Sequence, residues 1–496
     1  MRTDRNEPWR EELRKAIPAK ERTAIPRVVM PELEPKYRIK TQMEVNEGLS
    51  LSQAVLEATR CLDCPDPGCI KGCPVHNDIP GFIKNIERRD FSGAMEVLNR
   101  TTVLPAVCGR VCPQEKQCEA GCTYLKMKKK PVSIGALERF AADFEREVSA
   151  NMPKAKEDTE GREKGKPFFP IKIAVIGSGP SGLTFAGDMA RRGYQVTVFE
   201  ALSRLGGVLK YGIPEFCLPD AIVDHEISKL EKMGIEFRND CCIGKTLSYD
   251  ELQAQGFQAI YYATGAGRPR FMGIPGENIN GVMTANEYLM RLNCFGPYIF
   301  GVNGASLKEK SVAVIGGGNT AIDAVRYAVR MGAERAMIIY RRDRLEMPAR
   351  LEEIRHAEEE GVEFLMLHNP IEFLADEKGY LRAIKLQKME LGEPDASGRR
   401  KPVPVEGDIR EVEVQLAIES VGYLPNPPLL PPGVELSQWG EILVDLESMK
   451  SSAPSIYAGG DIVRGPSTVI NAMGDGRKAA ASMAAAFESA MSNIKL

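Results

Sequence analysis

Two copies of one local pattern constrain the fold of this chain more than any other feature. Each copy is a short apolar β run that leads into a glycine-rich turn and then a helix, at residues 171–182 and 311–321. A further β run follows each helix, at 195–200 and 336–340. A strand, a tight glycine turn, a helix and a second strand make a βαβ unit. The sequence therefore predicts two α/β units with parallel sheets.

The first glycine turn has the features of a dinucleotide site. Gly177, Gly179 and Gly182 have the spacing Gly-x-Gly-x-x-Gly at a strand-to-helix junction. These glycines permit a tight turn and let a pyrophosphate approach the helix N-terminus. Glu200 ends the second β run, where a carboxylate can accept hydrogen bonds from a ribose. A glycine turn without a ligand is the alternative, but the strand, helix and acid together favour a nucleotide.

The second turn differs at the end of its second β run. That run ends in Tyr340, Arg341 and Arg342 rather than in an acid. Guanidinium groups suit the 2′-phosphate of NADP(H), which a carboxylate would repel. The pattern favours NADP(H) over NAD(H), with a solvated arginine pair as the alternative.

Eight of the 12 cysteines lie close together in the N-terminal third of the chain. They form two blocks, Cys61-x2-Cys64-x4-Cys69-x3-Cys73-Pro74 and Cys108-x3-Cys112-x5-Cys118-x3-Cys122. Soft thiolates suit iron–sulfur clusters or zinc, and the last cysteine of a run followed by proline commonly crosses to a second cluster. Zinc ribbons also use paired cysteines, but they rarely need four within so short a stretch twice over. We therefore expect two [4Fe–4S] clusters, with zinc as the alternative.

Charge and hydropathy exclude several classes of protein. The formal net charge of −3 gives no reason to expect nucleic acid or an anionic membrane as a partner. The charged N-terminal residues have no apolar core of a signal peptide, and no stretch of about 18 uncharged apolar residues occurs. We expect a cytoplasmic protein whose clustered cysteines are metal ligands rather than disulfides.

Motifs spread along the chain resemble one family of oxidoreductases. They lie, in order, at 177–182, 211–214 (Tyr-Gly-Ile-Pro), 263–265 (Ala-Thr-Gly), 316–321, 340–342, 346–349 (Glu-Met-Pro-Ala) and 458–461 (Ala-Gly-Gly-Asp). Together they resemble the NADPH-dependent glutamate synthase small-subunit family over residues 50–490. The cysteine pattern at 108–115 looks closer to a sister group, the large subunit of the electron-bifurcating NADH-dependent ferredoxin:NADP oxidoreductase. Dihydropyrimidine dehydrogenase has a similar N-terminal half.

The resemblance implies an α/β fold with a helical N-terminal domain that carries two [4Fe–4S] clusters. Two Rossmann-like domains of the thioredoxin reductase type follow, and the NADP domain is inserted in the FAD domain. We expect the iron–sulfur domain at residues 1–150, with a loosely packed lead-in up to residue 50, and a linker at 151–170. The FAD domain is expected at 171–290 and 426–496, and the NADP domain at 291–425.

The resemblance also implies which residues contact the cofactors. Asp461 would bind the ribityl-phosphate side of FAD, and the helix that starts near Thr468 would direct its amides at the flavin. The implied FAD residues are Gly177, Gly179, Pro180, Ser181, Gly182, Glu200, Ala201, Arg204, Gly206, Gly207, Thr264, Gly265, Gly460, Asp461, Thr468 and Val469. The implied NADP(H) residues are Gly316, Gly318, Asn319, Thr320, Ala321, Arg341 and Arg342.

Cys217 departs from the family pattern, and the fourth ligand of the second cluster has two candidates. Cys217 stands where the family usually has arginine, so a cation beside the cofactor is lost. A relative uses a carboxamide as the fourth ligand of one cluster, and Glu138 matches that position here. We expect the first cluster at Cys61, Cys64, Cys69 and Cys122, and the second at Cys73, Cys112, Cys118 and Glu138. Cys108 is the competing fourth ligand, and spacing alone does not decide between them.

These features predict an NADPH-dependent oxidoreductase subunit that passes electrons between NADP(H), FAD and two clusters to a partner. That partner is a glutamate synthase large subunit or a small NAD-binding flavoprotein, with ferredoxin as a further candidate. The alternative enzyme is the NADP(H)-binding, flavin-bifurcating subunit. A disulfide reductase would need a Cys-x-x-Cys in the NADP domain, and residues 300–425 contain no cysteine. A non-enzyme alternative is a docking module that carries clusters but has lost its nucleotide sites, and the intact glycines argue against it. The four histidines form no recognisable catalytic arrangement.

Overall fold

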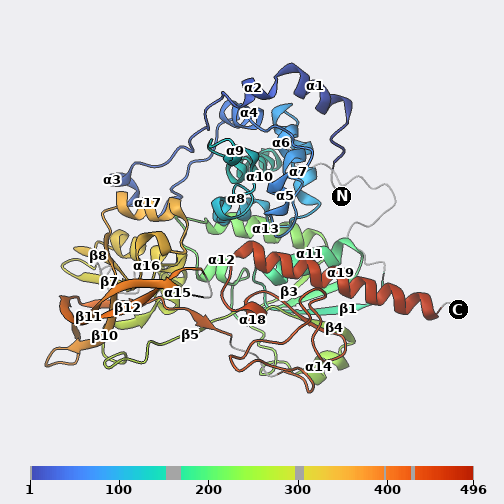
Figure 1. Cartoon of the computed structure of the whole chain (residues 1–496). Coiled ribbons are helices and arrows are strands. Elements are labelled where there is room, and N and C mark those ends of the chain that lie inside the picture. The colour runs from blue at the N-terminus through green and yellow to red at the C-terminus, as the bar shows by residue number, and fades with distance from the viewer. Residues whose placement is uncertain (1–2, 152–168, 297–306, 396–397, 426–429, 495–496) are drawn as a thin grey trace.

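The computed structural model describes residues 3–151, 169–296, 307–395, 398–425 and 430–494. The chain forms a helical N-terminal unit and two units that are each built around a parallel sheet (Figure 1). This is the fold class that the sequence predicts. The expected linker at 151–170 falls almost wholly outside the described residues.

The N-terminal unit consists of short helices. They are α1 (Pro8–Ala16), α2 (Ala19–Arg22), α3 (Pro35–Arg38), α4 (Leu51–Thr59), α5 (Gly68–Lys71), α6 (Ile79–Glu87), α7 (Phe91–Asn99), α8 (Pro105–Val111), α9 (Thr123–Lys126), α10 (Ile134–Asn151) and the 3₁₀ turn η1 (Gln114–Lys116). Ser50 and Gln53 form a capping box at the start of α4. The carboxylates of Asp78 and Asp90 accept hydrogen bonds from the first turns of α6 and α7. Side-chain oxygens before the apolar runs therefore set where these helices begin.

The lead-in before residue 50 is tied to the rest of the molecule, so the expectation of a loosely packed segment is wrong. The side chains of Arg10, Arg22 and Arg38 are at most 2% exposed. Arg22 pairs with Glu87 at 2.8 Å, and Arg38 pairs with Glu360 of the second sheet unit at 2.8 Å. Buried ion pairs with distant residues, rather than local apolar periodicity, hold this segment.

The first sheet unit has a five-stranded parallel sheet in the order β15-β4-β1-β2-β3. Its strands are β1 (Lys172–Ile176), β2 (Gln195–Phe199), β3 (Glu236–Arg238), β4 (Phe257–Tyr262) and β15 (Ile456–Ala458). Its helices are α11 (Pro180–Arg191), α12 (Val208–Tyr211), α13 (Asp220–Lys232), α14 (Tyr249–Ala254), α18 (Asp461–Arg464) and α19 (Val469–Ile494). Phe185 of α11 stacks on Tyr261 of β4 with ring centroids 4.1 Å apart, which fixes that helix on the sheet.

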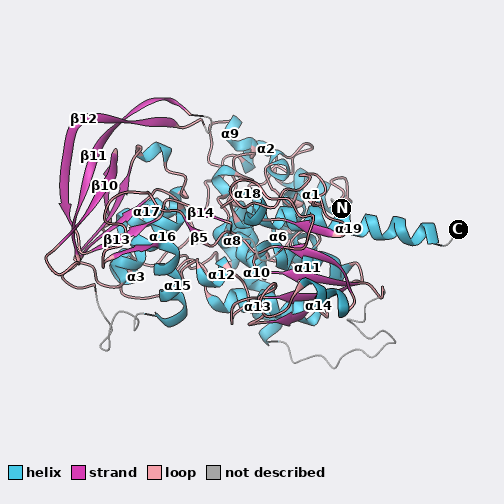
Figure 2. Cartoon of the chain, turned by 90° about the horizontal axis from the view of Figure 1, so that it is seen from below, coloured by secondary structure: helices cyan, strands magenta, loops and turns pink. Residues whose placement is uncertain are grey.

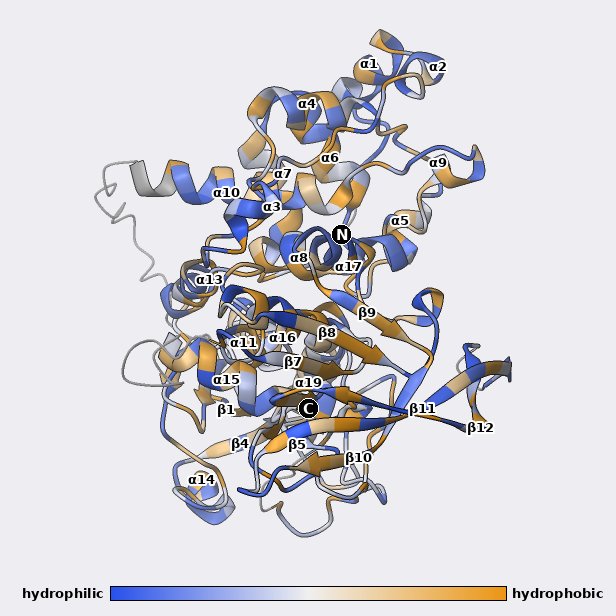
Figure 3. Ribbon diagram, turned by 90° about the vertical axis from the view of Figure 1, so that its left-hand side faces the viewer, coloured by the Kyte–Doolittle hydropathy of each residue, from blue (hydrophilic) through white to orange (hydrophobic). Residues whose placement is uncertain are grey.

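The second sheet unit has the order β6-β13-β7-β8-β9, also parallel. Its elements are β6 (Val282–Thr284), α15 (Ala285–Phe295), β7 (Ser311–Ile315), α16 (Asn319–Arg330), β8 (Arg335–Tyr340), η3 (Arg344–Glu346), α17 (Leu351–Glu359), β9 (Glu363–Met366) and β13 (Leu416–Glu419). The antiparallel strands β10 (His368–Ala375), β11 (Leu381–Pro394) and β12 (Arg400–Glu413) form a long curved arm (Figure 2). Buried apolar residues fill the inner strands β7 and β8 (Figure 3).

The second sheet unit is inserted into the first. β15 follows that unit in sequence, yet it pairs in parallel with β4, with Ile456 opposite Ile260. The chain crosses between the units through β5 (Arg268–Pro269) and β14 (Tyr423–Leu424), which pair antiparallel. β6 and α15 pack in the second unit although both begin before residue 291, the expected domain boundary.

The N-terminal unit and the first sheet unit share one hydrophobic core, to which Phe82 and Leu104 contribute from one side and Met473 from the other. Arg477 of α19 donates a hydrogen bond to the carbonyl oxygen of Thr101. The cysteine-bearing unit is therefore packed directly on α19. Among the described residues, no helix is long and apolar enough to cross a membrane.

Candidate functional site

The glycine turn between β1 and α11 leaves part of its backbone uncovered. Gly177 has φ +103°, and a Cβ there would meet the carbonyl oxygen of Ala263. A Cβ on Gly182 would meet the carbonyl oxygen of Gly177, so only glycine lets α11 approach the strand this closely. A Cβ on Gly179, by contrast, would have no neighbour within 4 Å. The open side lies at the N-terminus of α11, where backbone amides can bind a phosphate.

Two distant loops converge on this turn. Gly206 and Gly207 both have positive φ, at +116° and +54°, and a Cβ on Gly207 would stand 3.1 Å from the Cα of Gly179. Gly460, with φ +80°, approaches Ser181 so that a Cβ would stand 3.0 Å from the Cβ of that serine. The structure thus brings together residues from three of the motifs that the sequence predicted to bind FAD.

A third loop adds an unsatisfied polar group. A Cβ on Gly265, where φ is +72°, would have no neighbour within 4 Å. The adjacent hydroxyl oxygen of Thr264 is buried and has no hydrogen-bond partner among the described residues. A ligand could approach the uncovered backbone of Gly265 and form a hydrogen bond with the unpaired hydroxyl of Thr264. These residues therefore fit FAD, and their individual contacts stay predictions.

Both acids predicted for this site are held by backbone amides. The carboxylate of Glu200 accepts hydrogen bonds from the N–H groups of Ser178 and Leu202, each at 3.0 Å. The carboxyl of Asp461 accepts one from the N–H of Ser467 at 3.2 Å. Burial raises the pKa of Asp461 to about 7, so near neutral pH this group can donate as well as accept a hydrogen bond.

The remaining predicted FAD residues lie at helix starts or on the surface, and one of them is engaged in an ion pair. Pro180 is the first residue of α11, and Thr468 directly precedes α19, which begins at Val469. Arg204 forms an ion pair with Asp220, and Ala201 is exposed. The start of α19 is therefore where the sequence places it, whereas the ion pair of Arg204 indicates a structural role for that side chain.

The second glycine turn repeats the geometry of the first. Gly316 has φ +145°, and a Cβ there would meet the carbonyl oxygen of Ser420, whereas a Cβ on Gly318 would have no neighbour within 4 Å. Asn319 and Thr320 open α16 and Ala321 is buried behind them. The N-terminus of α16 is open in the same way as that of α11.

The two arginines after β8 differ in their surroundings. Arg342 is 5% exposed, pairs with Asp395 and donates from Nε to the carbonyl oxygen of Arg400 at 2.8 Å. Arg341 is exposed, and no acid pairs with it in the described part of the chain. Partial desolvation by the surrounding protein and the neighbouring Arg342 lower the pKa of Arg341, although its side chain reaches solvent. Sequence reasoning missed the partners of Arg342, because they lie at the distant tip of the β11–β12 arm.

The first cysteine group lies near the surface. Its members line one cavity together with Pro67 and Thr123; they are Cys61, Cys64, Cys69 and Cys122. Burial and the three neighbouring thiols raise the pKa of Cys69 above its ordinary value. A Cβ on Gly68 would meet the carbonyl oxygen of Gly121, and a Cβ on Gly121 would meet the carbonyl oxygen of Gly68. Only glycines let the two ligand loops approach this closely.

The second cysteine group is buried. Cys73, Cys112 and Cys118 are its thiols, and the carboxyl group of Glu138 interacts electrostatically with all three. Burial raises the pKa of Glu138 to about 8, although Asn77 donates a hydrogen bond to its Oε1 at 3.3 Å. The structure thus has one partly exposed and one buried set of thiols, and the assignment of individual cysteines to two clusters stays a prediction.

Cys108 lies in the same buried region as Glu138. Its thiol contacts that of Cys112 and lies 3.5 Å from Sδ of Met473 on α19. Both competing ligands therefore stand beside the second group. The choice of Glu138 stays a prediction.

The thiols of the two blocks lie farther apart than the ligands of a single zinc ion would. Four thiolates at about 2.3 Å from one zinc ion lie about 3.8 Å apart. Among the described residues, two groups of three possible ligand atoms lie within 4.8 Å of one another, and neither contains a cysteine from the two blocks. The thiols are spread around a larger volume, which fits a four-iron cluster.

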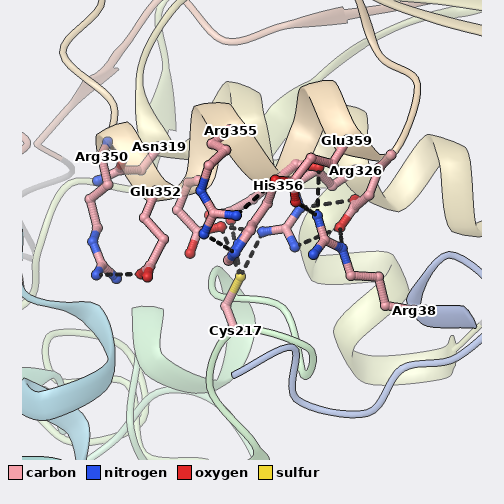
Figure 4. Close-up of polar contacts among 12 residues, drawn as sticks. Arg38, Cys217, Asn319, Arg326, Arg350, Glu352, Arg355, His356 and Glu359 are labelled. Carbon is pink, nitrogen blue, oxygen red and sulfur yellow. Dashed lines mark hydrogen bonds and ion pairs between the residues drawn. The ribbon is translucent and has the colours of Figure 1, made fainter. Parts of the chain in front are cut away.

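Cys217 lies where the first sheet unit meets α16 and α17 (Figure 4). Nη1 of Arg326 is 3.6 Å from its Sγ, and the same guanidinium lies 4.8 Å from the ring of Phe216. A cation from α16 therefore stands beside Cys217, and the expected loss of a cation beside the cofactor stays a prediction. Arg326 also pairs with Glu353, one of the two acids that contact Cys217, whereas burial raises the pKa of the other, Asp323, to about 8.

Comparisons with known proteins agree with this arrangement. Residues 38–150 match the family described as dihydropyrimidine dehydrogenase domain II, 4Fe-4S cluster, and residues 171–476 match the pyridine nucleotide-disulphide oxidoreductase family. The glutamate synthase [NADPH] small chain of Escherichia coli is 36% identical over 470 residues, which are 92% of this chain and 96% of the relative. The corresponding small chain of Azospirillum brasilense is 35% identical and covers 88% of this chain and 90% of its own length.

Other matches are partial. The putative oxidoreductase AegA of Escherichia coli is 36% identical over 86% of this chain, which spans 65% of that protein. Among solved structures, Mycobacterium tuberculosis FprA in complex with NADPH superposes with a TM-score of 0.55 at 22% identity, over 65% of this chain and 86% of that one. This likeness concerns the fold of the two sheet units.

Proposed function

This chain belongs to the family of the NADPH-dependent glutamate synthase small chains, and we propose that it is the electron-input subunit of a larger complex. It is an oxidoreductase that uses NADP(H), FAD and 4Fe–4S chemistry. When bound, FAD would supply the capacity to accept a hydride from NADPH and release single electrons, and the clusters would supply one-electron transfer. The protein holds the cofactors in position and provides the charges and dipoles around them.

The residues of the chain perform the binding steps. The open amides at the start of α11 would hold the FAD pyrophosphate, and those of α16 would hold that of NADPH. The Glu200 carboxylate, already fixed by two backbone amides, keeps one orientation toward a ribose. No side chain is required as a general base, because a hydride carries its own electron pair.

One observation supports the direction of electron flow most strongly. The buried second cysteine group lies against α19 of the first sheet unit, through Cys108 and Met473, whereas the first group is partly exposed. Electrons could therefore pass from the flavin-binding unit to the second group, then to the first group near the surface. From there a partner protein could accept them.

The name of the relatives as small chains supports a large subunit as that partner. We propose a glutamate synthase large subunit in first place. A disulfide reductase is disfavoured, because it would need a Cys-x-x-Cys in the NADP domain and residues 300–425 have no cysteine.

The test is metal, flavin and redox analysis of the purified chain. We expect about eight irons per chain, one releasable FAD and reduction of both chromophores by NADPH without oxygen. Cys61→Ser with Cys69→Ser should lose about four irons, whereas the matched control Cys241→Ser with Cys242→Ser, outside both blocks, should lose none. Zinc in place of iron, or a colourless protein, would refute the proposal.

A further inference from the structure

We propose that the lysine loop, residues 125–130, is the docking surface for an acidic redox protein that takes electrons from the first cysteine group. This inference rests on the proposed function, since it names the kind of partner for the same outlet. The loop consists of Leu125, Lys126, Met127, Lys128, Lys129 and Lys130.

The loop begins directly beside the first cysteine group, which is partly exposed. Cys122 is the residue before α9, and α9 runs into the loop. The hydroxyl of Thr123 lies 3.3 Å from Sγ of Cys64, so both ligand loops meet at the base of α9. A partner bound over residues 125–130 would therefore be close to the outermost cluster. The second cysteine group, by contrast, is buried.

The loop combines positive charge with apolar surface. All six residues are exposed, and Leu125 and Met127 are 45% and 39% exposed. No acidic side chain pairs with Lys126, Lys128 or Lys130 within the ranges that the structure describes. The whole chain has a net charge of −3, so this concentration of cations is a local feature. Apolar anchors within a charged rim are typical of protein interfaces.

The loop is held in one shape by buried groups. Arg60, next to the ligand Cys61, donates hydrogen bonds to the carbonyl oxygens of Lys130 at 2.7 Å and Pro131 at 3.0 Å. Nζ of Lys129 donates to the carbonyl oxygen of Thr23 at 2.6 Å. Backbone N–H groups of the loop return to Leu125 and Tyr124, and the hydroxyl of Tyr124 is itself buried and hydrogen-bonded. A surface ordered before binding loses less entropy when a partner docks.

These features specify an acidic protein rather than a lipid surface. Unpaired lysines attract and orient an acidic face, which raises the rate of encounter. Two partly exposed apolar side chains offer little to the acyl region of a bilayer. The partner must accept single electrons: each NADPH gives two as a hydride, leaves NADP⁺ and a proton, and reduces two one-electron acceptors.

Two haem proteins of opposite charge serve as probes, acidic cytochrome b5 and basic cytochrome c. The test variant is Lys126→Gln, Lys128→Gln and Lys130→Gln together, which spares the hydrogen bond of Lys129. The matched control removes three exposed lysines elsewhere, by Lys232→Gln, Lys245→Gln and Lys378→Gln. The readouts are the dissociation constant for each haem protein and the rate of its reduction by NADPH, at low and high salt.

We expect the intact chain to bind cytochrome b5 more tightly than cytochrome c. The test variant should bind cytochrome b5 roughly tenfold more weakly at low salt, and the difference should shrink below about threefold at 1 M salt, where screening acts over about 3 Å. The control variant should bind as the intact chain does.

Reduction of the chain's own chromophores by NADPH separates the two proposals. If it occurs normally in the test variant while docking weakens, both proposals stand. If NADPH fails to reduce the chromophores of the intact chain and of both variants, the proposed function is wrong. The dissociation constants for the two haem proteins still test whether residues 125–130 are a docking surface. Equal losses in test and control variants, unchanged binding in the test variant, or a loss confined to binding of anionic phosphatidylserine vesicles would overturn the docking proposal.

Discussion

Replacing the two arginines after β8 one at a time should separate coenzyme recognition from folding. Arg341 is exposed, whereas Arg342 is 5% exposed and engaged by Asp395 and by the carbonyl oxygen of Arg400. We predict that Arg341→Ala removes a cation that contacts the 2′-phosphate of NADPH. We predict that Arg342→Ala chiefly loosens the β11–β12 arm.

The magnitudes follow from these surroundings. A hydrogen bond between charged groups contributes about 1.5–3 kcal/mol, so Arg341→Ala should lower the preference for NADPH over NADH roughly 10- to 150-fold. Arg342→Ala breaks an ion pair whose acid, Asp395, is still 29% exposed and partly hydrated. The loss of unfolding free energy should therefore be about 1–2 kcal/mol, below that of a fully buried pair.

The assay is the ratio of kcat/KM for NADPH to that for NADH, with ferricyanide as acceptor, together with thermal unfolding of each variant. Asp395→Asn is the matched control, because it breaks the same ion pair and keeps both cations. We expect it to lower stability as Arg342→Ala does while leaving the coenzyme preference almost unchanged. An Arg341→Ala variant with the full preference for NADPH would show that the phosphate is bound elsewhere.

Four further outcomes test the sites. Gly182→Ala places a methyl group against a backbone carbonyl oxygen and should yield a protein less stable by about 1–3 kcal/mol that has lost its flavin absorbance, as visible spectra and thermal unfolding would show. Glu138→Ala should remove the electron paramagnetic resonance signal of the second cluster while Cys108→Ser retains it; the reverse result would assign the fourth ligand to the cysteine. Burial and a neighbouring carboxyl group raise the pKa of Glu419 to about 8, so the folded state favours its protonated form and stability should fall as pH rises from about 4.5 toward 8; in denaturant unfolding Glu419→Gln should flatten that profile, and an unchanged slope would contradict it. The isolated chain should not form glutamate from glutamine, 2-oxoglutarate and NADPH, although NADPH-dependent dye reduction should persist; stoichiometric glutamate would refute the electron-input role.

Local patterns were sufficient to predict the nucleotide turns. The spacing of Gly177, Gly179 and Gly182 forces a strand, a turn and a helix into one arrangement, because a Cβ at two of these positions would meet backbone. Helix α7 begins directly after Asp90, whose side chain caps it. Signals of this kind depend on residues a few positions apart, which a sequence displays directly.

The two cysteine blocks are visible in the sequence because short spacings put their thiols on common loops, whereas the exchange of Cys73 and Cys122 between the blocks stays a prediction. The insertion of the second sheet unit could be anticipated from the motif order. The exact point at which the chain changes units could not, since β6 joins the second sheet through pairing with β13, far along the chain.

The kinds of site, namely two open glycine turns and two thiol groups, are legible along the chain because each is encoded by a few neighbouring residues. Which charges are available depends on the fold. It placed Asp395 on Arg342, Arg326 beside Cys217, and Glu360 on Arg38 of the lead-in. A buried charge needs a partner of opposite sign wherever the fold brings one close. That partner can lie anywhere in the chain, so no local pattern reveals it.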